Sequence, residues 1–151
     1  SSSLTPFIGQ NLGANQHVRI KKAINYCILL SGVWGLFVAL PLLIFRNEFS
    51  SLFSTDTQVR LHLISYLKII SLSYIFWGWS NIASAAFNGY QKPFVAAFIF
   101  LSRLFIITVP LVIIFNYYYG LVGIFYSIML SNIISGVISI YYTKSSKVFK
   151  K

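Results

Sequence analysis

A run of 23 residues without a single charge, Ala23 to Phe45, constrains this chain more than any other feature. An α-helix needs about 20 apolar residues to cross the hydrocarbon core of a bilayer, so this run is long enough to span a membrane. Three further runs share its character: Ile69 to Phe87, Phe94 to Phe115, which only Arg103 interrupts, and Leu121 to Tyr142. Each run is continuously apolar and does not alternate as the strands of a membrane barrel do, so we expect helices.

The composition makes lipid the solvent for most of this chain. Hydrophobic residues make up 57% of it and charged residues 9%, whereas about a quarter of an ordinary soluble domain is charged. Thr55 to Gln58 fits a capping box with Thr55 as the N-cap, so the second helix is expected to begin near Asp56, ahead of its apolar run. We therefore predict an all-α membrane protein with spans at about residues 23–45, 57–88, 93–115 and 120–142, followed by a basic tail at 143–151.

The basic residues fall unequally on the two sides that alternating spans create. One side carries eight of them and no acid: Arg19, Lys21, Lys22, Lys92, Lys144, Lys147, Lys150 and Lys151. The other side carries three basic residues and both acids of the chain: Arg46, Arg60, Lys68, Glu48 and Asp56. Because cytoplasmic loops hold the excess of Lys and Arg, both ends of the chain are expected in the cytoplasm. The net charge of +10 then follows from topology, and the expected partner is the lipid bilayer rather than a nucleic acid.

Residues that would carry catalytic or metal chemistry are scarce and scattered. The single cysteine, Cys27, lies within an apolar run, and His17 and His62 are far apart outside the spans. The sequence has no Ser-His-Asp set, no phosphate-binding glycine loop and no metal-ligand spacing, so we expect no enzyme, no bound metal and no cofactor. No span contains an acidic residue, although ion-coupled transport usually requires an ionisable group inside the membrane.

A few polar residues inside the spans are candidates to line a cavity. Arg103 is the only charge well inside a run, roughly 15 Å along the helix axis from Pro93. It either snorkels or bonds to carbonyls of a neighbouring helix, or it lines a cavity. Trp77, Asn81 and Ser84 share one face of the second span, where an aromatic ring beside an amide would suit a partly apolar ligand. Packing between helices is an equally good explanation of that face.

The fourth span carries serines at four-residue intervals, which places them near one helical face: Ser127, Ser131, Ser135 and Ser139. Small polar residues on one face usually mark close helix packing, and a water-filled pathway is the alternative. Of these, Ser131 and Ser135 are further candidates to line a cavity. Pro41 and Pro110 lie within spans and are candidate hinges, because proline interrupts the helical hydrogen-bond ladder.

The polar stretch that opens the chain, TPFIGQNLGANQHVRIKKA from Thr5 to Ala23, resembles the signature of the multidrug and toxic compound extrusion (MATE) family. That signature is a helix end reading T-P-x-x-G-Q-N, then G-A, then a basic residue. The matching positions are Thr5, Pro6, Gly9, Gln10, Asn11, Gly13, Ala14 and Arg19. The resemblance continues at Asp56, at FNGYQKP from Phe87 to Pro93, at Pro110 with Leu111, and at GLVGIFYS from Gly120 to Ser127.

The resemblance implies a place in a larger fold. Proteins of this family have two six-helix bundles related by pseudo-symmetry, and this chain corresponds to the end of the eighth helix through the twelfth. The first seven helices are then expected to be missing, and the N-terminal bundle becomes a partner of this segment. The implied location is the plasma (inner) membrane, as a multi-pass protein.

The resemblance also implies an activity, which is export of organic cations and other amphipathic compounds by antiport against H+ or Na+. Some members place coupling carboxylates in the seventh and tenth helices. The span that matches the tenth helix, Ile69 to Phe87, contains no acid. The coupling-ion site is therefore expected outside this chain, which alone should not transport.

Two other functions stay open at this point. One is a lipid-linked oligosaccharide flippase of the same superfamily, which usually lacks the GQN-x-GA signature. The other is a small tetraspan scaffold protein, in which the serine face is a packing seam and the GQN stretch is an ordinary loop.

Overall fold

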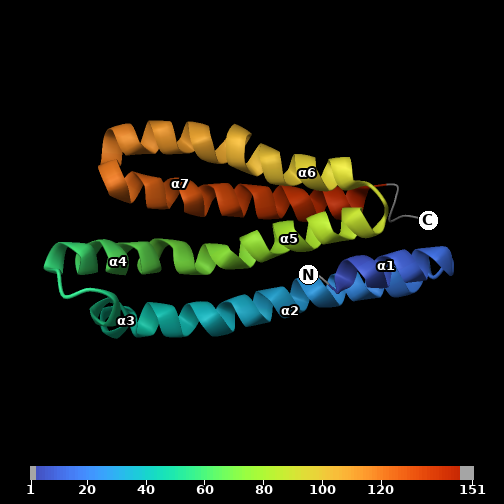
Figure 1. The fold of residues 1–151 in the computed structure, drawn as a ribbon, viewed down its shortest axis with the longest axis horizontal. Coiled ribbons are helices and arrows are strands. Elements are labelled where there is room, and N and C mark those ends of the chain that lie inside the picture. Colours follow the sequence, from blue (N-terminus) through green and yellow to red (C-terminus); the bar gives the residue numbers. More distant parts are fainter. Residues whose placement is uncertain (1–2, 147–151) are drawn as a thin grey trace.

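The computed structural model describes residues 3–146, which form long helices lying side by side (Figure 1). The described residues contain no strand. In chain order the helical elements are α1 (Leu4–Gly13), α2 (His17–Ile44), α3 (Arg46–Phe53), α4 (Thr57–Ile70), η1 (Ser71–Ser73), α5 (Tyr74–Gly89), α6 (Pro93–Leu101), η2 (Ser102–Thr108) and α7 (Val109–Ser145). η1 is a 3-10 turn that joins α4 to α5, and η2 is a π-helical segment that joins α6 to α7.

Three helical stretches of the described chain are long and apolar enough to cross a membrane: His17–Ile44, Thr57–Gly89 and Pro93–Ser145. The third contains two of the predicted spans, because the chain reverses direction within α7 at Gly120, whose φ of 57° and ψ of −141° are not helical. Ser127 Oγ donates a hydrogen bond of 2.9 Å to the carbonyl of Leu111 across this reversal. In Figure 1 the two arms of α7 before and after this reversal lie side by side, and α1 is a shorter helix beside α2 and α5.

The turn that ends α1 closes as a Schellman motif. The N–H of Gln16 donates to the carbonyl of Asn11 at 2.8 Å, and the N–H of Asn15 donates to that of Leu12 at 3.1 Å. Asn15 takes the left-handed conformation with φ of 55°, as residues just beyond a helix often do. The left-handed position of this turn is thus Asn15.

The turn between α5 and α6 repeats this geometry. The N–H of Lys92 donates to the carbonyl of Phe87 at 2.9 Å, and Gln91 takes the left-handed conformation with φ of 58°. Gly89, the last residue of α5, packs on α1: a Cβ added there would lie 2.6 Å from Cβ of Ile8. The absence of a side chain at Gly89 therefore allows α1 and α5 to approach closely.

The start of α4 differs in detail from the predicted capping box. The N-cap is Asp56, whose Oδ1 accepts a hydrogen bond of 2.8 Å from the N–H of Gln58. The prediction of Thr55 was one residue early, because the short carboxylate side chain reaches the second residue of the helix. The connection before it contains α3, an eight-residue helix that the sequence analysis did not predict.

The turns are segregated by end of the molecule. Figure 1 shows the α1–α2 turn, the α5–α6 turn and the C-terminal end of α7 at one end, and α3 and the reversal within α7 at the other. Arg19, Lys21, Lys22, Lys92 and Lys144 therefore share one end. The remaining basic residues of the predicted tail, Lys147, Lys150 and Lys151, lie outside the described residues.

Candidate functional site

A chain of hydrogen bonds links the two irregular segments in the interior of the bundle. Arg103 of η2 donates from Nη1 to Oδ1 of Asn132 in α7 at 2.9 Å. Asn132 Nδ2 donates to Oγ of Ser73 in η1 at 3.1 Å, and Ser73 in turn donates to the carbonyl of Ile70 at 2.7 Å. Asn132 and Ser73 are both buried, so each polar group is satisfied inside the protein. The chain of bonds holds the guanidinium at one position.

The π-helical segment that carries Arg103 ends next to Pro110. Proline has no N–H to donate to the carbonyl four residues earlier, so regular α-helical bonding is lost at this point. The N–H of Val109 bonds to the carbonyl of Leu104, five residues back. The Thr108 hydroxyl donates to the carbonyl of Arg103 at 2.8 Å and also contacts the hydroxyl of Ser131. The irregularity predicted at Pro110 thus lies in the turns before it.

Pro41, the other candidate hinge, lies inside α2, which continues from His17 to Ile44. The carbonyl of Pro41 accepts a hydrogen bond of 2.8 Å from the N–H of Phe45. The helix is therefore continuous through Pro41. A hinge role for either proline stays a prediction.

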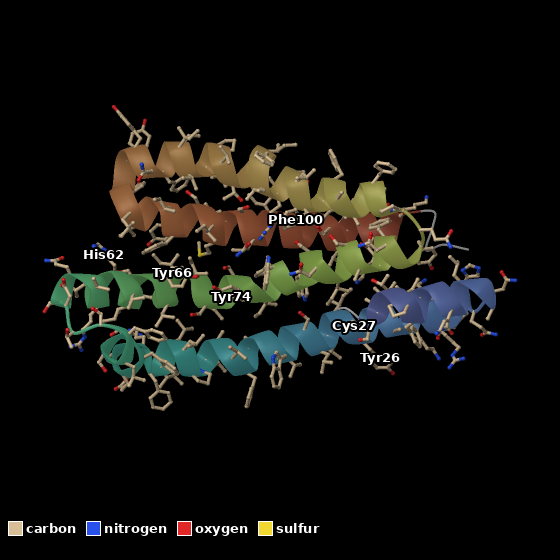
Figure 2. The ribbon with its side chains drawn as sticks, viewed as in Figure 1. Tyr26, Cys27, His62, Tyr66, Tyr74 and Phe100 are labelled. Atoms are coloured by element: carbon tan, nitrogen blue, oxygen red, sulfur yellow. The ribbon has the colours of Figure 1, made fainter. Side chains whose placement is uncertain are left out.

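Four of the six residues predicted to line a cavity border one small pocket of about 10 Å3: Trp77, Asn81, Ser84 and Arg103. The pocket lies between α5 and the α6–η2 arm, and Phe100 also borders it, at the middle of the bundle (Figure 2). Cζ of Arg103 is 5.8 Å from the centroid of the Phe100 ring, within cation–π distance. Asn81 Nδ2 donates to the carbonyl of Trp77 at 3.0 Å, which orients the amide beside the indole.

The other two predicted residues, Ser131 and Ser135, do not border that pocket. They are buried, with 1% and 4% of their surfaces exposed. Ser135 Oγ lies 3.0 Å from Ser80 Oγ of α5, and a Cβ added at the adjacent Gly136 would lie 2.5 Å from the carbonyl oxygen of Phe76. Ser135 and Gly136 therefore lie at a close contact between α7 and α5. Ser135 also borders a separate groove of about 630 Å3 between α7 and the α6–η2 arm.

The residues of the GQN motif lie at the end of the bundle, away from Arg103. Asn11 is the buried one: its Nδ2 donates to the carbonyl of Phe7 at 2.8 Å, and its own carbonyl accepts the bond that closes the α1 turn. Thr5, at the start of the motif, is half-buried, and its hydroxyl donates to the carbonyl of Ala85 in α5 at 3.1 Å. The exposed motif residues include Gly9, Gln10, Gly13, Ala14 and Arg19. The motif therefore contacts α5 through Thr5 and shapes a helix end through Asn11.

A larger groove of about 1060 Å3 lies between α1, α2 and α5, and the sequence analysis did not predict it. Its aromatic lining comes from all three helices: Phe7 of α1, Tyr26 and Trp34 of α2, and Trp77 of α5. Figure 2 labels Tyr26 and Cys27 on α2 beside α1. Trp77 and Asn81 border both this groove and the small pocket at Arg103. These two residues therefore lie between the two hollows.

Sequence reasoning also missed three polar residues that are hydrogen-bonded to Arg103 or to its neighbours: Ser73, Thr108 and Asn132. Each is a polar residue within an apolar span, and such a residue must find a partner inside the protein. That signal was present, but it did not identify the partners, because they come from three different elements. No group of three His, Cys, Asp or Glu residues suitable for a metal ion occurs in the described part of the chain.

Comparisons with known proteins agree with this arrangement of helices. The MatE family model matches residues 1–114. A curated relative, an FAD transporter of Shewanella oneidensis, is 35% identical over 141 residues, which are 93% of this chain and 31% of that protein. Protein DETOXIFICATION 29 of Arabidopsis thaliana is 23% identical over 133 residues, which are 87% of this chain and 27% of that protein.

Among solved structures, the bent form of the Vibrio cholerae MATE transporter VcmN matches with a TM-score of 0.91 at 26% identity. The match covers 98% of this chain and 33% of that one. The chain therefore spans about a third of the length of the relatives that it matches.

Proposed function

This chain belongs to the MatE family, whose members are integral multi-pass membrane transporters and not enzymes, and we propose that it forms part of an exporter of amphipathic small molecules. The observation that carries the proposal is the match of 98% of the chain to one third of a MATE transporter at a TM-score of 0.91. Such a match favours a segment of a transport bundle over a separate kind of membrane protein.

In the proposed exporter this chain contributes most of the second helical bundle, and a first bundle completes the transport path. The two bundles rock about a central cavity that opens alternately to each side. The basic end of the molecule, with Arg19, Lys21, Lys22, Lys92 and Lys144, faces the cytoplasm of a cell whose plasma (inner) membrane holds the protein.

Transport is driven by antiport against H+ or Na+ in this proposal. The two acids of the chain, Glu48 and Asp56, lie in α3 and at the start of α4, at the end of the bundle away from the predicted cytoplasmic turns. Neither lies near the middle of a span, where a coupling carboxylate would act. The coupling site is accordingly proposed outside this chain.

The proposed cargo is an amphipathic molecule with an aromatic part. Trp77, with 43% of its surface exposed, and Asn81 border both hollows, which is a combination suited to a flat ring with polar edges. Organic cations are one class of such cargo. The relative named as an FAD transporter adds a second class, aromatic anions. The packing of Ser135 against Ser80 fits the scaffold alternative as well as a transport bundle, and the match to a MATE transporter favours the bundle.

The test is transport by the intact protein in proteoliposomes. We expect efflux of ethidium or of FAD that requires an imposed H+ or Na+ gradient and stops when an ionophore collapses it. Residues 1–151 reconstituted alone are expected to give no gradient-driven efflux. Absence of efflux of either compound by correctly folded intact protein would refute the proposal, and activity of the 1–151 segment alone would refute the placement of the coupling site.

A further inference from the structure

Arg103 provides a binding site for one kind of chemical group. We infer that the Arg103 guanidinium binds an anionic group, a phosphate or carboxylate, on an aromatic molecule carried by the transporter. This inference rests on the proposed function and names the substrate class of that transporter. It selects the aromatic anion over the organic cation.

The charge of Arg103 has no acidic counterpart in the membrane-spanning part of this chain. Every span lacks Asp and Glu, and within the described residues the side chain has one neutral hydrogen-bond partner, Asn132. A guanidinium has several N–H donors and no acceptor, so a single amide oxygen leaves most of its capacity unused. A positive charge within a low-dielectric span attracts an anion strongly and repels a cation.

The guanidinium is held in place before any ligand arrives. Asn132 presents Oδ1 to Arg103 because its Nδ2 is bound to Ser73, whose own hydroxyl is bound to the carbonyl of Ile70. The π-helical turns around Arg103 are tied by Thr108 to α7 through Ser131. An arginine fixed in this way loses less conformational entropy when it binds an anion, and its planar fork suits carboxylate and phosphate oxygens.

The surroundings of Arg103 match a charged group attached to a ring. The pocket that it borders holds only about 10 Å3, which is the space of roughly one water molecule. It therefore has room for one oxygen of an anionic group and excludes the body of a drug-sized molecule. Trp77 and Asn81 border this pocket and also the larger aromatic groove. In the proposed complex a ring lies against Trp77 and its charged substituent reaches Arg103.

The experiment uses the intact transporter and two probes that share one ring system, riboflavin and flavin mononucleotide, which differ in a single phosphate. In Arg103→Gln the affinity for flavin mononucleotide should fall by about tenfold to a hundredfold, the effect of losing charged hydrogen bonds. The affinity for riboflavin should change by less than about twofold. Arg103→Lys should retain part of the preference for flavin mononucleotide over riboflavin, because lysine keeps the charge and loses the planar fork.

The matched control is Arg46→Gln, which removes the same charge far from the pocket. Arg46 Nη1 donates to the carbonyl of Leu43 at 3.1 Å at the start of α3, so both affinities should stay as in the parent protein. Binding is followed by quenching of flavin fluorescence and transport by gradient-driven efflux.

Two results would overturn the inference while leaving the proposed function intact. One is an equal loss of affinity for both flavins in Arg103→Gln. The other is an unchanged ratio of the two affinities in Arg103→Gln together with a lower unfolding temperature in the absence of flavin. That result would mean that the partner of Arg103 is a carboxylate elsewhere in the transporter. If the parent protein transports neither flavin nor ethidium, the proposed function fails instead.

Discussion

Substitution of Gly136 tests a close contact between α7 and α5. A Cβ added there would lie 2.5 Å from the carbonyl oxygen of Phe76, 2.7 Å from its Cβ and 2.9 Å from its carbonyl carbon. Ordinary contact begins at 3.4 Å, so Gly136→Ala must separate the two helices by about 0.9 Å. Most of the contacted atoms are backbone or Cβ, which cannot rotate away.

The cost follows from what this separation disrupts. Overpacking a tight contact costs about 1–3 kcal/mol. The Oγ–Oγ contact of Ser80 and Ser135, now 3.0 Å, would stretch beyond hydrogen-bond length, at about 1 kcal/mol. Alanine recovers about 0.5–1 kcal/mol in helix propensity. We therefore expect Gly136→Ala to lower the free energy of unfolding by about 1–3 kcal/mol.

The assay compares the thermal unfolding of purified Gly136→Ala and Gly32→Ala in one detergent. Gly32 lies in α2, and nothing lies within 4 Å of an added Cβ. The control should therefore be as stable as the parent or slightly more stable, through helix propensity alone. Equal stability of the two variants would contradict the close contact between α7 and α5.

Two further substitutions test local features of the fold. Asp56→Ala should cost about 0.5–2 kcal/mol of unfolding free energy and fray the start of α4, because it removes the N-cap bond to Gln58. Thr55→Ala should cost much less. A lower unfolding temperature for Thr55→Ala than for Asp56→Ala would restore Thr55 as the cap. Asn15→Val should destabilise by about 1–3 kcal/mol because a β-branched residue is strained at φ of 55°; Asn15→Gly should be tolerated, and equal unfolding temperatures would contradict this turn geometry.

Much of the architecture could be predicted because lipid leaves a strong mark on sequence. In lipid, an uncharged run such as Ala23 to Phe45 satisfies its backbone hydrogen bonds by forming a helix. The short turn at Gly120 makes the two helical arms on either side of it antiparallel. The α3 helix escaped prediction because eight residues in a connecting segment carry little periodicity. The partner of Arg103 could not be predicted either, since it depends on the crossing of separate elements and not on spacing along one helix.

The π-helical winding of η2 determines the direction about the helix axis in which each later side chain of this arm points, up to the reversal at Gly120. A π-turn holds more residues than an α-turn, and one residue on a regular helix corresponds to about 100° of rotation. A helical wheel drawn continuously from Pro93 to Phe115 would therefore assign the wrong faces beyond Thr108. Removing one residue from Ser102–Thr108 could restore α-helical winding and leave the later faces in place, whereas removing one from α6 or from the start of α7 would turn them out of register with α5 and the returning arm of α7.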